Sequence, residues 1–203
     1  MSSFHVLKVS RLEGLTDGIF AIAMTIMILN LHVPDQASIT DVDPIVNASL
    51  VSTLFIYVGS FIILGTHWIA MNFQLGLLDH LNRPYLWTNM FYLMVICVIP
   101  FSANFLGKFP YNVHSIEFYA GNLLCGSLGQ FVVMQTAHYF KLNKDKYTSA
   151  IRRAALQRMM VAPPFYIASI AVAHWNMRLA FVMLVAPTLL YIFPGRIDRY
   201  ESS

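Results

Sequence analysis

The sequence predicts an all-α, polytopic membrane protein with six transmembrane helices in one domain, residues 1–203. Hydrophobic residues make up 57% of the 203 residues and charged residues only 11%, and the mean hydropathy is +0.60. These values lie outside the range of soluble domains and are typical of chains that cross a bilayer several times. The two cysteines fall in apolar stretches, where they suggest neither a disulfide nor a metal site.

Six stretches meet or nearly meet the length of about 20 mostly apolar residues that a membrane span needs. They run over residues 12–33, 46–76, 85–107, 115–140, 158–174 and 177–194. The second stretch is too long to lie wholly in hydrocarbon, so we expect its end, Gln74 to His80, to project into water as helix. Pro163 and Pro164 come near the start of the fifth, where a helix tolerates proline.

Charged side chains lead directly into the first apolar stretch, at Arg11, Glu13 and Asp17. A charge at the start of a membrane helix is costly unless it has a partner or a water-filled space to face, so these residues indicate function or assembly. At 100° per residue, Arg11 and Asp17 lie roughly 120° apart and cannot pair along one face of the helix. We therefore expect both to find partners on other helices.

The same first helix carries an aliphatic stripe with a single hydroxyl group. Within a sector of about 80° the helical geometry gathers five side chains, namely Gly18, Ile22, Thr25, Ile26 and Leu29. Such a stripe either packs against a neighbouring helix or, repeated around a symmetry axis, lines a pore with rings of Ile and Leu. One six-helix unit cannot surround a pore with its first helix alone, so the pore interpretation requires a homo-oligomer.

The first helix also carries a recognisable signature. Arg11-x-x-x-Leu15-Thr16-Asp17 resembles the Arg-x-x-x-Phe-Ser-Asp motif of the transmembrane protein 175 family, the endosomal and lysosomal potassium channels and their prokaryotic relatives. Leu15 replaces Phe and Thr16 replaces Ser. His67-Trp68 in the second stretch and Pro100-Phe101 in the third are also similar to the family.

This resemblance implies a potassium-selective channel built from four copies. In the pore interpretation of the stripe, the first helix lines the pore and the gate or filter lies at Ile22, Thr25, Ile26 and Leu29. The resemblance also implies a structural polar network that anchors the first helix to its neighbours, for which the candidates are Arg11, Thr16, Asp17, His67 and Trp68. His67 is alternatively a proton-sensitive switch. The family's equivalent distance from the motif favours Ile22 as the tightest ring.

Selection among ions cannot rely on a loop of free carbonyl groups, because the Thr-Val-Gly-Tyr-Gly filter is absent from the sequence. The carbonyl groups of an intact first helix are already used in its own hydrogen bonds. The width of the pore at its aliphatic rings, together with the Thr25 hydroxyl, would have to distinguish potassium from other cations. We therefore expect only modest selectivity.

Basic residues are distributed unevenly between the predicted loops. One side of the membrane receives most of the Lys and Arg residues, including the run from Lys141 to Arg158, and the other receives only Lys108 and Arg178. The positive-inside rule then places both termini in the cytoplasm, in a multi-pass protein of the cell membrane. Anionic lipid headgroups explain the basic run without nucleic acid.

The outer loop between the first two stretches is acidic, with Asp35, Asp41 and Asp43 and no basic residue. Copies of it around a pore mouth would raise the local cation concentration. The alternative is an ordinary solvated loop of polar residues that has no effect on cations, and the sequence favours it at least as much.

Other functions have less support in the sequence. It contains no H-E-x-x-H pair, P-loop, G-x-G-x-x-G or G-x-S-x-G motif, so we expect no enzyme, no cofactor and no metal site. A secondary transporter would favour ionisable groups near the membrane midplane, whereas the charges here cluster at helix ends. A non-conducting membrane scaffold remains the other alternative and predicts no ion flux.

Overall fold

The computed structural model describes residues 8–29 and 44–192, and within them all regular structure except one isolated bridge is helical. The prediction of an all-α fold is confirmed. The seven helices of the described residues are α1 (Val9–Leu29), α2 (Pro44–Gly76), α3 (Arg83–Lys108), α4 (Val113–Tyr139), α5 (Ser149–Met159), α6 (Ala162–Ala173) and α7 (Met177–Ile192). The acidic loop residues Asp35, Asp41 and Asp43 lie outside the described residues.

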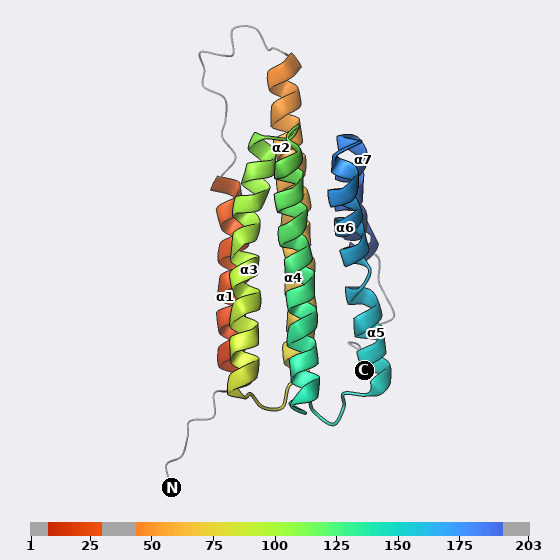
Figure 1. Ribbon diagram of the computed structural model, residues 1–203. Coiled ribbons are helices and arrows are strands. Elements are labelled where there is room, and N and C mark those ends of the chain that lie inside the picture. Colours follow the sequence, from red (N-terminus) through yellow and green to blue (C-terminus); the bar gives the residue numbers. More distant parts are fainter. Residues whose placement is uncertain (1–7, 30–43, 193–203) are drawn as a thin grey trace.

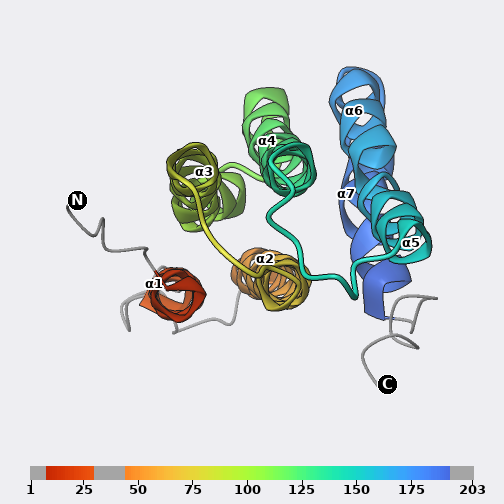
Figure 2. The same ribbon diagram turned by 90° about the horizontal axis from the view of Figure 1, so that it is seen from below.

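The helices run side by side along one long axis (Figure 1). Seen along that axis, α1 lies at one edge beside α2 and α3, and α5 to α7 form the opposite edge (Figure 2). The most extensive contact joins α3 and α4. It is tight at Gly129, where an added Cβ would come within 3.3 Å of Tyr92. A small residue at this point lets two membrane helices approach closely.

One apolar core joins the long helices. Its fully buried side chains come from α1, α2, α3 and α4 and include Phe20, Leu64, Tyr92, Ile96 and Leu123. α6 and α7 join it through Tyr166, Ala180 and Leu184. The core therefore fixes which face of each helix points inward, α1 included.

The carboxyl-terminal part differs in one respect from the sequence prediction. The predicted fifth span, residues 158–174, is α6 from Ala162 to Ala173, and a separate helix, α5, precedes it. The axis breaks at Met160 and Val161, and Pro163 and Pro164 follow Ala162, the first residue of α6. α2 also ends earlier than expected, at Gly76, and the residues up to His80 form a turn rather than projecting helix.

Four helical segments among the described residues are long and apolar enough to cross a membrane, by length and composition. They are α1, the Thr53–Gly76 part of α2, α3, and Ser149–Ala173, which joins α5 to α6. α4 has 27 residues, about 40 Å of helix at 1.5 Å per residue, but polar side chains lower its hydropathy. α7 is shorter, with 16 residues.

The charges separate along the axis as the sequence predicts. α1 begins, α2 ends, α3 begins and α4 ends at one end of the bundle, which we call the basic end; it carries Arg11, Arg83 and Lys141 (Figure 1). Lys108 and Arg178 lie near the turns at the other end. α5 ends part-way up the bundle, so Arg158, one residue before its last, lies above the basic end.

Candidate functional site

α1 has one buried face and one exposed face. Leu12, Thr16, Phe20, Ala23 and Met27 are buried against α2 and α3. The predicted stripe lies on the other side: 59% of Ile22, 43% of Ile26 and 74% of Leu29 are exposed, against 3% of Met27. Within one chain, the stripe is therefore available for a second copy, lipid or an aqueous pore.

Arg11 belongs to the same exposed stripe. Seven residues separate it from Gly18, which brings the two within roughly 20° on the helix. Arg11 is exposed, and the described residues offer its guanidinium no hydrogen-bond or ion-pair partner. The stripe therefore begins with a charge at its basic end and continues as aliphatic side chains.

A groove with a volume of ≈ 410 Å³ lies between α1 and α3 beside this stripe. Ile22 and Ile26 form its α1 side, and Pro100, Phe101 and Asn104 belong to its α3 side. In the sequence, Pro100-Phe101 is recognisable only by its similarity to the family. Its position next to Ile22 could not be inferred, because it depends on how α3 packs.

The Thr25 hydroxyl is less available than the sequence suggests. It donates to the carbonyl oxygens of Ala21 and Ile22 at 2.9 and 3.0 Å. Its proton is therefore used within α1, and only a lone pair of its oxygen can face outward. Thr25 contributes at most a weak coordinating group to the stripe.

Asp17 does find a partner on another helix. The Trp68 indole Nε1 of α2 donates to Asp17 Oδ1 at 2.9 Å. Both side chains are exposed in the single chain. Thr16, the third candidate at this level, is fully buried, and its hydroxyl has no hydrogen-bond partner within residues 8–29 and 44–192. The α1–α2 contact thus contains a charge-assisted hydrogen bond.

His67 belongs to a different set of contacts from Asp17. Its Nδ1 lies 3.1 Å from Gln130 Oε1 and 3.3 Å from Tyr92 Oη, so it joins α2 to α4 and α3. Successive helical residues point about 100° apart, which explains why Trp68 faces α1 while His67 faces the core. The predicted polar network is two separate sets of contacts, and Arg11 belongs to neither within the described residues.

Three amide side chains of α4 each contact a different neighbouring helix. Asn122 lies 3.0 Å from Ser102 Oγ of α3, Gln130 contacts His67 of α2, and the Gln135 side chain accepts from Arg152 of α5 at 3.0 Å. Such bonds are the interhelical contacts expected of polar groups at membrane depth. They hold α2, α3 and α5 around α4.

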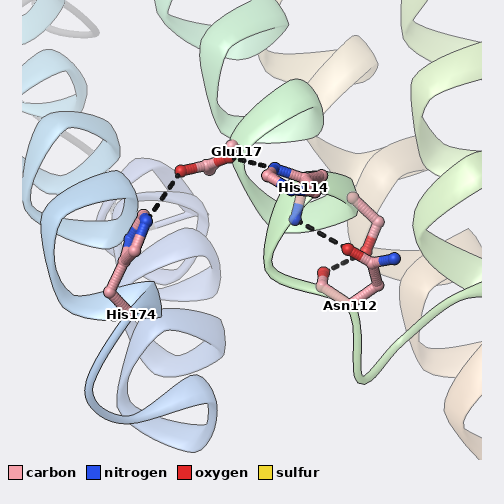
Figure 3. A network of polar contacts seen from close by, with 5 residues as sticks. Asn112, His114, Glu117 and His174 are labelled. Carbon is pink, nitrogen blue, oxygen red and sulfur yellow. Dashed lines mark hydrogen bonds and ion pairs between the residues drawn. The ribbon is translucent and has the colours of Figure 1, made fainter.

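The sequence does not predict a cluster of one carboxylate and two histidines that lies at the end opposite the basic end. Glu117 of α4 pairs with His114 on its own helix, Nδ1 to Oε2 at 2.9 Å, and with His174 after α6, Nε2 to Oε1 at 3.5 Å (Figure 3). The spacing of residues 114 and 117 signals the first pair, but nothing in the sequence signals the second. The described residues contain no group of three or more His, Cys, Asp or Glu side chains placed to hold a metal ion.

These features define a class of protein: a multi-pass helical membrane protein whose first helix leaves a long apolar face, with a charge at one end, uncovered by its own chain. The family described as endosomal/lysosomal potassium channel TMEM175 matches residues 11–100. That range contains the Arg11 motif, His67-Trp68 and Pro100, so the similarity to this ion-channel family extends over α1, α2 and most of α3.

Two relatives are similar to this chain in sequence, and one solved structure is similar to it in fold. A potassium channel of Chryseobacterium sp. (strain P1-3) is 24% identical over 95% of this chain and 96% of its own. A potassium channel of Streptomyces collinus is 28% identical over 49% of this chain and 48% of its own. The crystal structure of a lysosomal potassium-selective channel TMEM175 homologue from Chamaesiphon minutus superposes with a TM-score of 0.75 at 18% identity, covering 91% of this chain and 96% of that one.

Proposed function

We propose that this chain is the subunit of a potassium-permeable cation channel, in which copies of α1 surround the pore. The observation that carries the proposal is the two-sided burial of α1. Its inner face is packed, whereas Arg11, Ile22 and Leu29 form a continuous exposed stripe. An arginine at the head of the stripe favours a wet surface or another protein copy over lipid. The relatives named potassium channels support potassium as the permeant ion.

The pore requires several copies, and we propose four, arranged with the α1 stripes around the axis. The excess of basic residues at one end of the bundle supports a cytoplasmic location for that end, with the protein in the cell membrane. Each copy contributes one ring member at Ile22, Ile26 and Leu29. Asp17 and Trp68, exposed in the single chain, lie where a neighbouring copy would cover them.

Selectivity in this pore comes from width rather than coordination. The exposed stripe offers apolar side chains, and the Thr25 hydroxyl proton is bonded within α1. A hydrated ion passes an apolar constriction only when the ring is wide enough to stay wet. We therefore propose passive conduction with modest preference for potassium over sodium, and aliphatic rings that act as the gate.

The test is purified protein in liposomes with a potassium gradient and a flux readout. We expect a potassium flux that follows the electrochemical gradient, needs no second ion and rises linearly with the gradient. Saturating flux coupled to a second ion would indicate a secondary transporter instead. Protein that reconstitutes as an oligomer and yields no flux would indicate a scaffold.

A prediction concerns the acidic outer loop. Replacing Asp35, Asp41 and Asp43 with Asn should lower the cation current at low ionic strength, because the carboxylates concentrate cations at the pore mouth. At 1 M salt the Debye length is about 3 Å, so the same variant should match the wild type. Single-channel currents at both salt concentrations measure the effect, and Asp79→Asn at the basic end is the matched control. Equal currents at low salt would leave the loop as an ordinary solvated connection.

A further inference from the structure

Two adjoining cavities are lined by residues of α2, α4 and α5. Of these helices, α5 lies at the edge of the subunit opposite α1 (Figure 2). The space open to the centre of a water molecule is ≈ 90 Å³ in the larger and ≈ 10 Å³ in the smaller. One water needs about 10–15 Å³ on this measure. The larger cavity can thus hold several waters and the smaller about one. Phe73, Gln74 and Ala155 line both, so the cavities are neighbours.

The larger cavity is lined by polar side chains from several helices. His67 and Gln74 come from α2, Ser127 and Gln130 from α4, and Arg158 from α5. All but Arg158 are less than 10% exposed. Arg158 is held at the end of α7, where its guanidinium donates to the Tyr191 carbonyl oxygen at 3.1 Å. The described lining residues include this arginine and no carboxylate, so the cavity is unsuited to a cation.

Three residues that line the smaller cavity carry a buried polar atom without a partner. Gln74, Tyr85 and Tyr147 belong to the lining, and Gln74 Oε1, Tyr85 Oη and Tyr147 Oη have no hydrogen-bond partner within the described residues. The Gln74 amide is 8% exposed, and its nitrogen has only the weak acceptor Met159 Sδ, at 3.9 Å. Buried polar groups in native proteins are nearly always paired with protein or with ordered water. Three lining residues with an unpaired oxygen, beside a cavity that fits one water, point to such a water.

The loop between α4 and α5 closes this region at the basic end. Asp79 N donates to Leu142 O and Lys144 N to Leu77 O, both at 2.9 Å, and Lys144 Nζ bonds the Gly76 carbonyl oxygen at 2.8 Å. These bonds fix the loop across the end of α2 and hold Tyr147 beneath the cavities. Burial raises the pKa of the Tyr147 hydroxyl, which the nearby Arg152 charge partly offsets, so its oxygen stays protonated and able to donate.

We propose that the two cavities hold a chain of ordered water that runs from the Tyr147 loop, past Gln74, to His67. The Tyr85 and Tyr147 hydroxyl groups donate to the first water, which in turn donates to Gln74 Oε1. In the larger cavity the waters meet Ser127, Gln130 and His67. The other titratable groups that face this cavity are Arg158 of α5, Tyr166 of α6 and Tyr191 of α7, and Tyr92 of α3 contacts His67 directly. The buried His67 is thereby hydrated from the basic end, and this site does not depend on the pore proposed above.

Hydroxyl-radical footprinting of the full chain in liposomes tests the proposal. X-ray radiolysis of bound water oxidises side chains beside it, and a scavenger in bulk solution does not prevent this. Met159 lines the larger cavity and is 9% exposed, while Met71 is fully buried and lines neither cavity. We expect Met159 to be oxidised several-fold faster than Met71 and to keep that rate with scavenger. Met160, 39% exposed, should lose most of its rate.

Two variants locate the water. Ala155→Leu places a larger side chain in both cavities, and Gln74→Leu removes the unpaired acceptor with little change of volume. Each should lower the Met159 rate to about that of Met71, with unchanged elution and unchanged Met160 oxidation. Because the variants act separately, failure of one to fold leaves the other to decide.

Three results would overturn the proposal. A wild-type Met159 rate equal to that of Met71 means a dry cavity, for example one filled by a lipid chain. A Met159 rate that falls with scavenger, as that of Met160 does, means bulk access rather than ordered water. If Met159 is still oxidised at the wild-type rate in a folded Ala155→Leu or Gln74→Leu variant, and scavenger does not lower that rate, the water lies elsewhere.

Discussion

An Ile22→Asn channel should carry a several-fold larger potassium current than the wild type and should distinguish potassium from sodium less well. Ile22 is 59% exposed on the stripe of α1 and borders the groove against α3. If copies of it form the narrowest ring, an amide in place of the aliphatic group keeps the constriction wet, and ions no longer have to shed water there. Single-channel recording with potassium and sodium on opposite sides measures both quantities.

The matched control is Met27→Asn on the opposite face of the same helix. Met27 is 3% exposed in the core, so the substitution removes buried apolar contacts at a cost of about 2–5 kcal/mol. The unpaired amide adds about 1–3 kcal/mol. We expect this variant to lose yield and thermal stability without gaining conductance. A leaking Met27 variant beside an Ile22 variant that merely loses yield would assign the pore to the other face of α1.

Leu29→Asn separates the candidate rings. Leu29 lies about two turns beyond Ile22 on the same exposed stripe and is 74% exposed. Ile22 is favoured as the tightest ring by the resemblance to the channel family, whereas the burial of a single chain does not rank the two. If Leu29→Asn gives the larger rise in current, the gate lies at that level.

The long helices of this fold follow from hydropathy alone, and the missed helix shows where that method fails. α1 to α4, α6 and α7 each correspond to a predicted apolar stretch, because burying the backbone in lipid requires a helix there. α5 carries Arg152, Arg153 and Arg158 and therefore has no apolar stretch to detect. Its signals are local instead: Thr148, whose side chain accepts from Ile151 N as an N-cap, and the prolines after its end.

The sequence predicts the directions in which the side chains of α1 point, but not which residues of other helices they contact. Helical geometry separates Ile22 from Met27, and the structure exposes the first and buries the second. It also requires an off-helix partner for Asp17, which is Trp68. The sequence cannot say that His67, the residue before Trp68, turns to Gln130 and Tyr92 instead. That difference depends on the rotation of α2 against α1 and α4, which only tertiary packing sets.

Asp17→Ala should reduce assembly of the channel more than it changes ion preference. Asp17 accepts the Trp68 indole hydrogen at 2.9 Å across the α1–α2 contact, and a hydrogen bond to a charged group contributes about 1.5–3 kcal/mol. In the proposed oligomer a neighbouring copy covers this pair, so the freed indole N–H finds no water to replace the carboxylate. We expect lower oligomer yield and a lower melting temperature in detergent, while the residual channels keep the wild-type ratio of potassium to sodium permeability.

A double-mutant cycle with Trp68→Phe identifies the pair as the cause. Phe keeps most of the aromatic contact and removes the donor, so the two single losses of stability should not add when the substitutions are combined. Arg11→Ala is the comparison, since Arg11 has no side-chain partner within the described residues. The loss of stability caused by Arg11→Ala should add to the loss caused by Asp17→Ala. If a neighbouring copy brings the two charges together, the two losses are non-additive in the oligomer only. If Asp17→Ala gives normal oligomers with altered ion preference, Asp17 faces the permeating ions and the anchoring role assigned to it is wrong.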